Sequence, residues 1–401
     1  MKTYQFLMDL ALILLSTKLC GIATKRFNMP QVVGALLAGL LLGPAVFNIL
    51  NETEFIMSLS EVGVIVLMFT AGLESDIQEL KKTGKASFII ALCGVLVPLA
   101  GGFGVAFLFN KPGVQYNDAS ASILLQNIFI GVILTATSVS ITVETLKELG
   151  KLNSKVGNAI MGAAIIDDIL GIIALTVITG TADETINVGF VLLKILAFFI
   201  CSGIVGVVFF YIFKKITDRY QKDMRRYVII AFVFCLLMAY CAEVFFGVAD
   251  ITGAYIAGLV LSNSKYAKYI LNRFEVVSYV LLSPIFFASI GLKVIIPKMN
   301  FDIVLFSLLL VIVALATKIL GCGFSAKACS YTNKESLQIG VGMISRGEVA
   351  LIVASKGAAV GLMSSSYFGP IIIVVLVTTI IAPILLKLTF RTKGKSTANS
   401  I

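Results

Sequence analysis

The chain has 401 residues and a formal net charge of +10, yet only 13% of its residues are charged and 58% are hydrophobic. Soluble domains carry about 25% charged residues, so this composition and a mean hydropathy of +1.00 exclude an ordinary soluble protein. Apolar segments long enough to cross the bilayer as helices, about 17 to 25 residues, recur from end to end. We therefore predict an all-α polytopic membrane protein, and we read the basic charge as a sign of membrane orientation and not of nucleic-acid binding.

The apolar pattern predicts about thirteen membrane spans. The first span follows a single lysine, Lys2, and no small-residue cleavage motif comes after it, so we interpret it as a retained helix. The seven cysteines show no metal-ligand spacing, and no metal site is expected from them. The expected spans lie near residues 5–22, 31–48, 57–72, 86–109, 123–146, 155–179, 187–213, 225–245, 250–262, 274–294, 302–325, 336–358 and 367–388.

Lysines and arginines alternate between the two ends of these spans. Almost all of the loop cations fall in every second connection, whereas the other side holds only Lys2, Lys111 and Lys298 together with acidic loops such as 51–54. Basic residues favour the cytoplasmic side of a membrane. We therefore expect a multi-pass protein of the cell membrane with its N-terminus outside and its C-terminus in the cytoplasm.

A weak internal repeat links the two halves of the chain. The segments VVGALLAGLLLGP (32–44) and ITGAYIAGLVLSN (251–263) share six of thirteen positions at a constant offset of 219 residues, and Gly72 and Gly291 continue the match. Chance similarity between apolar helices is one reading. The loop charges, however, give the two copies opposite directions through the membrane, which is typical of the inverted repeats of secondary transporters.

Two adjacent aspartates, Asp167 and Asp168, lie inside the apolar run AAIIDDILGI (163–172). A charged carboxylate at the centre of a membrane costs about 2.5–3.5 kcal/mol on insertion scales, so a proton, a cation or a buried base must compensate it. Neighbouring side chains point about 100° apart on a helix, which gives the two carboxylates different roles. Lys318 is the natural counter-charge for one of them, and it leaves the other to alternate between a proton and a cation. A pair that merely fixes helix packing is the alternative.

Two other spans contain unusually polar segments. The first is TATSVS (135–140) and the second is SRGE (345–348). Hydroxyl groups can bond back to their own helix, so a plain helix remains open for the first segment. Charge and irregular backbone at membrane depth are tolerated only when buried or when they line water, so either segment can instead be a broken helix that offers carbonyl groups to an ion.

Eight segments together make the chain resemble the monovalent cation:proton antiporter-2 family, specifically bacterial Na+/H+ antiporters built from a membrane domain alone. Each segment is weak by itself, but all eight occur in the order found in the family. They are MPQVVGALLAGLLLGP (29–44), VLMFTAGLESDI (66–77), TATSVSITVETLKELGK (135–151), AAIIDDILGI (163–172), ITGAYIAGL (251–259), SPIFFASIGL (283–292), ATKILGCG (316–323) and SRGEVALIV (345–353).

The resemblance implies a sodium/proton antiporter fold of thirteen helices with inverted repeats and two broken helices that cross near the ion site. A single transmembrane domain is expected over 1–388, with a dimerisation or panel subdomain and a core subdomain (57–179 and 274–388) that moves past it like an elevator. Residues 389–401 are expected to form a short cytoplasmic tail without a fused regulatory domain. A homodimer is also implied.

The family pattern carries roles onto individual residues. Asp168 is expected to be the principal carboxylate for Na+ and H+, with Asp167 as its partner and Lys318 as the counter-charge of Asp167 when no cation is bound. The crossover of the first broken helix is expected to supply hydroxyl ligands, and two charged residues are expected to organise the second. The hydroxyl residues are Thr135, Thr137 and Ser138, and the charged residues are Arg346 and Glu348.

The expected function is exchange of Na+ or Li+ for H+, in which the cation and the proton compete for Asp168 and Asp167. Because the chain has no histidine, protons carried near neutral pH must ride on carboxylates or a lysine. K+/H+ or mixed Na+(K+)/H+ exchange on the same fold is the nearest alternative, and a non-transporting membrane sensor is a remote one. No enzymatic activity, cofactor or nucleic-acid partner is expected; the partners are the lipid bilayer and the transported ions.

Overall fold

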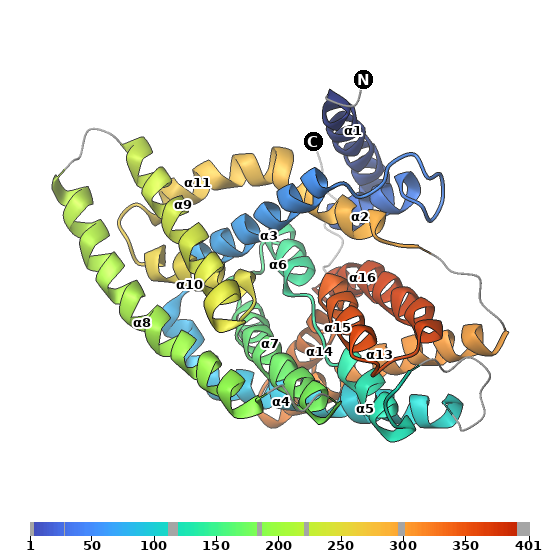
Figure 1. Cartoon of the computed structure of the whole chain (residues 1–401). Helices are drawn as coiled ribbons and strands as arrows, with labels where there is room; N and C mark the ends of the chain where they lie inside the picture. Colours follow the sequence, from blue (N-terminus) through green and yellow to red (C-terminus); the bar gives the residue numbers. More distant parts are fainter. Residues whose placement is uncertain are drawn as a thin grey trace, which may run out of the picture.

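A computed structural model describes residues 4–27, 29–110, 119–182, 187–219, 224–295 and 301–390. Over these ranges the chain is helical and contains no strand (Figure 1). Nine of the described helices are long and apolar enough to cross a membrane. They are α1 (Gln5–Arg26), α3 (Glu54–Glu74), α4 (Ile77–Phe109), α7 (Lys155–Ala182), α8 (Val188–Arg219), α9 (Met224–Cys241) continued by the π-helical turn η2 (Ala242–Phe246), α11 (Ala267–Val277) continued through the π-helical turn η3 (Ser278–Leu282) into α12 (Ser283–Leu292), α13 (Phe301–Ala328) and α16 (Phe368–Phe390).

The other spans are either short or interrupted. Two short helices, α2 (Gln31–Leu42) and α10 (Asp250–Ser262), cover two of the expected spans. Two further spans each consist of two half-helices, which are α5 (Ile123–Ile133) with α6 (Val139–Glu148) and α14 (Asn333–Gly342) with α15 (Gly347–Ala359). A short 3-10 turn, η4 (Ser365–Tyr367), precedes α16. The structure therefore confirms the all-α polytopic class and the two broken helices.

The helices pack into two bundles. In the first, here called the core bundle, α4 packs against α5, α7 and α13, while α16 packs against α13, α14 and α15; α6 belongs to this bundle through its contacts with α7 and α16. In the second, the panel bundle, α10 packs against α3 and α9, and α12 packs against α1, α2 and α3. Figure 1 shows α4, α5, α7 and α13 to α16 grouped on one side and α3, α9, α10 and α11 on the other, with α8 along the edge.

This grouping differs from the expected division in one respect. Residues 57–72 and 274–294 were expected in the core subdomain, but α3 and α12 pack mainly within the panel bundle. The cause is a set of close helix contacts that only glycine permits. A Cβ on Gly72 of α3 would collide with the carbonyl oxygen of Tyr255 in α10, and a Cβ on Gly291 of α12 would collide with the backbone of α2 at Leu36. Whether the two bundles move relative to each other remains a proposal.

The same contacts confirm the internal repeat. Gly39 of α2 packs on the backbone of Ala288 in α12, and Gly258 of α10 packs on the backbone of Phe69 in α3. Adding 219 to one member of the first contact and subtracting 219 from the other converts it into the second. Each contact thus has an equivalent in which the two halves of the chain have exchanged places. Such a pair of contacts indicates a twofold relation between the halves, as an inverted repeat requires.

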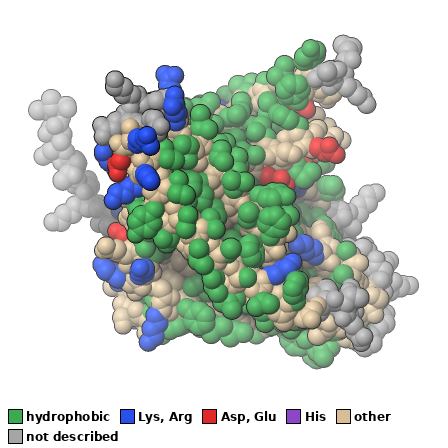
Figure 2. All heavy atoms as spheres, turned by 60° about the vertical axis from the view of Figure 1, so that its left-hand side comes forward, with side chains coloured by type: hydrophobic (Ala, Val, Ile, Leu, Met, Phe, Trp, Pro, Cys, Tyr) green, Lys and Arg blue, Asp and Glu red, His purple; other side chains and the backbone are tan. Residues whose placement is uncertain are grey.

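The outer surface is that of a membrane protein. Figure 2 shows a broad face covered by hydrophobic side chains, with Lys and Arg gathered mainly toward its left-hand edge. Exposed apolar residues lie along the whole of α8, from Phe190 to Ile212, where each is at least 42% exposed. We call the end of the spans at which Lys25, Lys147 and Lys155 lie the basic end.

Candidate functional site

The two broken helices cross at their interruptions. The backbone N–H of Ser138, between α5 and α6, donates to the carbonyl oxygen of Ser345, between α14 and α15, at 2.7 Å. The Thr142 hydroxyl on α6 donates to the carbonyl oxygen of Gly342 at the end of α14, also at 2.7 Å. Backbone groups that a continuous helix would bond internally are thus bonded across the crossing. The unwound reading of both polar segments is confirmed.

Gly347 allows the second interruption to approach the first. Its φ of +50° is a conformation that side chains with a Cβ rarely adopt. A Cβ at this position would also collide with the hydroxyl of Ser138. The glycine in the SRGE segment is therefore required by the backbone and by the close contact between the two broken helices.

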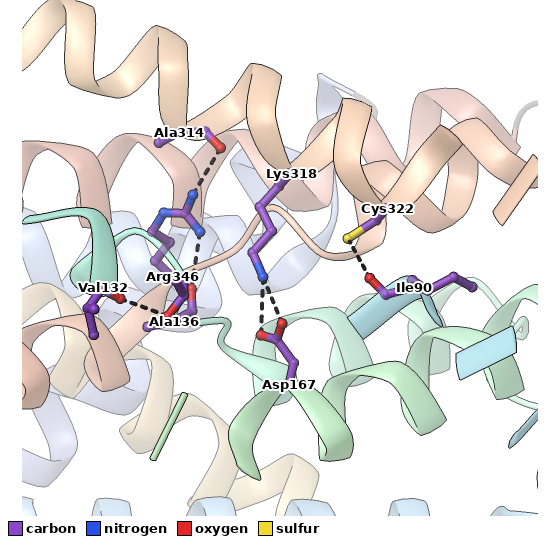
Figure 3. A network of polar contacts seen from close by, with 9 residues as sticks. Ile90, Val132, Ala136, Asp167, Ala314, Lys318, Cys322 and Arg346 are labelled. Carbon is purple, nitrogen blue, oxygen red and sulfur yellow. Dashed lines mark hydrogen bonds and ion pairs between the residues drawn. The ribbon is translucent and has the colours of Figure 1, made fainter. Parts of the chain in front are cut away.

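Asp167 and Lys318 form a buried ion pair in the core bundle (Figure 3). The Lys318 Nζ donates to Asp167 Oδ1 at 3.0 Å and to Oδ2 at 3.1 Å, and the side chains are 0% and 1% exposed. The aspartate lies on α7 and the lysine on α13, 151 residues apart in the chain. A charge buried this deeply is stable only when paired and hydrogen-bonded, so each group requires the other.

Arg346 links the first crossover to α13 (Figure 3). It is the largest fully buried side chain of the described residues, and its guanidinium donates to the carbonyl oxygens of Ala136 at 3.1 Å and Ala314 at 2.9 Å. Ala314 precedes Lys318 by one helical turn, so α13 positions both buried cations. Glu348, the other predicted crossover residue, begins α15, but its side chain lies outside the described part of the structure.

A cavity of about 80 Å³ lies beside the aspartates. Asp167 and Asp168 contribute to its wall, as do Thr135 and Thr137 of the first crossover, whereas Ser138 does not. From Asp168 the cavity extends along α7 toward Leu175 and toward the N-terminus of α10, which is the end opposite the basic end.

The three predicted hydroxyl ligands differ in their hydrogen bonds. Thr135 donates its hydroxyl to the carbonyl oxygen of Val132 at 2.7 Å, and Ser138 shares a 3.2 Å hydrogen bond with Ser140. The Thr137 hydroxyl is buried and has no hydrogen-bond partner among the described residues. A buried polar atom without a partner is costly, so this oxygen is suited to a ligand that enters the cavity.

The charges of the site fit a small hard cation. The Asp167–Lys318 pair is neutral as a unit, and Asp168 adds a second carboxylate to the wall of the cavity. Carboxylate, hydroxyl and carbonyl oxygens are the ligands that hard cations prefer. The arrangement can therefore hold either a monovalent cation or a proton at Asp168.

Several contacts of the site were not predicted from the sequence. Cys322 lies one turn after Lys318 on α13, and its thiol donates to the carbonyl oxygen of Ile90 at 3.8 Å. A Cβ on Gly94 of α4 would lie 2.7 Å from the Cys322 sulfur and 3.5 Å from Asp167 Oδ1, so this glycine leaves room for the ion pair. The i, i+4 spacing of Lys318 and Cys322 could have shown that they share a helix face, whereas nothing in the sequence singles out Gly94.

Comparison with known proteins gives consistent results. The family model described as "Sodium/hydrogen exchanger, transmembrane" matches residues 11–392. The chain is 38% identical to the "Na(+)/H(+)-K(+) antiporter GerN" of Bacillus cereus, covering 98% of each chain, and 37% identical to a "Na(+)/H(+) antiporter" of Enterococcus hirae, covering 96% of this chain and 97% of that one. Its fold matches the solved sodium proton antiporter MjNhaP1 of Methanocaldococcus jannaschii with a TM-score of 0.69, 19% identity and 97% coverage of both chains.

Proposed function

Because this chain belongs to the sodium/hydrogen exchanger family, we propose that it exchanges Na+ or Li+ for H+ across the cell membrane. The observation that carries the proposal is the cavity beside Asp168, which combines a carboxylate with the partnerless hydroxyl of Thr137. K+/H+ or mixed Na+(K+)/H+ exchange is the second candidate, because the name of the Bacillus cereus relative includes K+. The proposed activity moves ions, breaks no covalent bond and uses no cofactor.

Exchange follows from competition for one site. Na+ binds Asp168 when the carboxylate is ionised, with Thr137 as a further oxygen ligand and Asp167 close by. A proton on Asp168 removes the negative charge that attracts Na+, so each ion excludes the other. Arg346 keeps the first crossover in place through its bond to the Ala136 carbonyl. Lys318 neutralises Asp167 in the state without a bound cation.

Alternating access requires the core bundle to move past the panel bundle. The cavity beside Asp168 extends toward the end opposite the basic end. At the basic end, Lys147 of α6 forms a 3.0 Å ion pair with Glu74 of α3 and donates to the Thr70 hydroxyl at 2.9 Å. The Gln31 backbone N–H of α2 donates to Glu148 of α6 at 2.7 Å. These contacts join the two bundles at the basic end, and they must break when access switches.

On the loop charges we assign the basic end to the cytoplasm, with the N-terminus outside and the cavity facing outward. We assign the chain to the cell membrane. A homodimer is part of the proposal, formed through the panel bundle while the core bundle moves. Inward proton flow then drives Na+ out of the cell.

Transport in inverted membrane vesicles tests the proposal. The interior is acidified, Na+, Li+ or K+ is added in turn, and a pH-sensitive dye reports proton exit. Na+ should release protons in the unaltered protein and in Asp302→Asn, a matched change at an exposed position at the start of α13, but not in Asp168→Asn. A response to K+ alone supports the second candidate, and no response to any cation in folded, inserted protein refutes both.

A further inference from the structure

A second and much larger cavity lies away from the aspartates. Its volume is about 960 Å³, near the upper limit of the roughly 300–1,000 Å³ typical of small-molecule sites. It is enclosed by α1 and α2, by the end of α6, and by the segment from α11 to α12. It therefore spans the boundary between the panel bundle and the core bundle, and we call it the interbundle cavity.

One wall of the interbundle cavity lies on the outer surface of the helices. Ile22, Tyr279 and Val280 line it and are 57%, 58% and 60% exposed on the outside of the spans. Farther from the basic end the lining is apolar, with residues such as Leu14 and Phe287. A molecule in this cavity can thus place an apolar part against the deeper wall and a polar part nearer the basic end.

Charged side chains of both signs line the polar part. Lys18 of α1 and Glu275 of α11 are each eight residues from the basic end of their helices, a distance of about 12 Å along the helix axis. Lys18 Nζ donates to the Tyr279 hydroxyl at 2.9 Å, so α1 and η3 are in contact beside the cavity. Glu144 of α6 and Lys25 near the end of α1 complete the set.

Both carboxylates in this set lack partners. Within the described part of the chain, the carboxylates of Glu144 and Glu275 make no hydrogen bond or ion pair, although both face the cavity. Two other charged residues of the lining already have partners. Lys147 is paired with Glu74, and Glu148 accepts the hydrogen bond from the Gln31 backbone N–H. Glu144 is half-buried and Glu275 lies exposed on an apolar span, where an unpaired carboxylate requires a cation or hydrogen-bond donors.

From this pattern we infer that the interbundle cavity binds a phospholipid with a phosphoethanolamine headgroup. The primary ammonium carries three N–H donors, which suit the carboxylates of Glu144 and Glu275. The phosphate suits Lys18 and Lys25, because lysine binds phosphate as a point charge. A headgroup with a phosphate alone would leave both carboxylates uncompensated. A choline headgroup has the same charges, but its quaternary ammonium has no N–H to donate.

Thermal unfolding of the purified full-length protein tests this inference without relying on transport. The protein is depleted of lipid in detergent, and Tm is measured with phosphatidylethanolamine, phosphatidylcholine or phosphatidylglycerol of identical acyl chains. At about tenfold excess over Kd, phosphatidylethanolamine should raise Tm by about 2 °C. The other two lipids should raise it by less than half of that. Water-soluble glycerophosphoethanolamine should have no effect, because it lacks the apolar part.

Two variants connect the shift to the cavity. Glu144→Gln with Glu275→Gln should abolish the advantage of phosphatidylethanolamine over phosphatidylcholine, whereas Glu243→Gln, the same change at an exposed position outside the cavity, should retain it. Tm without lipid and the elution volume show whether each variant is folded. If the double variant does not fold, Lys18→Gln replaces it and should weaken the shift.

Four results would overturn the inference. Equal stabilisation by all three lipids means that the headgroup is not recognised. Greater stabilisation by phosphatidylglycerol indicates an anionic lipid instead. A phosphatidylethanolamine shift that persists in folded cavity variants places the lipid elsewhere, and no shift with any lipid shows that the cavity has another occupant, such as a second copy of the chain.

Discussion

Replacing Lys318 by methionine tests whether the buried ion pair stabilises the core bundle. Methionine keeps much of the length of the lysine stem but carries no charge. Two unit charges 3.0 Å apart attract each other by about 5 kcal/mol at an effective dielectric constant of about 20. Removing one partner of a buried pair typically costs about 3–5 kcal/mol, because the other charge remains buried alone. At roughly 1.2 °C per kcal/mol for a chain of 401 residues, Tm should fall by about 4–6 °C.

The matched experiment removes both charges. Lys318→Met with Asp167→Leu leaves no unpaired group, so its Tm should recover at least half of the loss seen in the single variant. Tm is measured on detergent-solubilised protein at pH 7 by tyrosine fluorescence, since the chain has no tryptophan, and by loss of the folded peak in size exclusion. A double variant as unstable as the single one, or a single variant within 2 °C of the unaltered protein, would show that the pair is not the source of the stability.

Three further predictions follow from separate parts of the structure. Gly72→Ala should lower Tm by several degrees, because the added Cβ collides with the Tyr255 carbonyl oxygen. Gly84→Ala on α4 should leave Tm unchanged or raise it, because the Cβ added there meets no neighbouring atom within 4 Å. Thr137→Val should raise the Na+ concentration for half-maximal proton release about fivefold at unchanged Tm, because the lost hydroxyl has no hydrogen-bond partner among the described residues. Thr135→Val, which removes a bond to Val132, should lower Tm, and an unchanged Na+ dependence in Thr137→Val would refute the ligand role. Outside the spans, the Thr332 backbone N–H donates to Glu335 at 2.8 Å and lowers the pKa of that carboxyl below 4.5. The stability that this hydrogen bond gives to the N-terminus of α14 is therefore present above pH 4.5 and is lost as pH falls through the lowered pKa. The Tm difference between the unaltered protein and Glu335→Gln should be larger at pH 7 than at pH 3.

The class of the molecule and the locations of its spans could be read from local properties of the chain. Each span is a continuous apolar segment, and the free energy of burying it in hydrocarbon depends on that segment alone. The adjacent aspartates were conspicuous for the same reason, since a carboxylate in an apolar run is costly wherever the rest of the chain lies. The repeat between α2 and α10 was also visible in the sequence, because both helices need small residues at the same positions.

Relations between distant segments required the tertiary structure. The sequence suggested Lys318 as a counter-charge for one aspartate, but the 3.0 Å contact with Asp167 depends on how α7 packs against α13. Composition left open whether the 135–140 segment is helical, and the hydrogen bond from Ser138 to Ser345 decided the matter. The sequence determined which residues are costly in a membrane, because that cost is local. Only the fold decided which group compensates each of them, because compensation depends on contacts over a few ångströms between residues far apart in the chain.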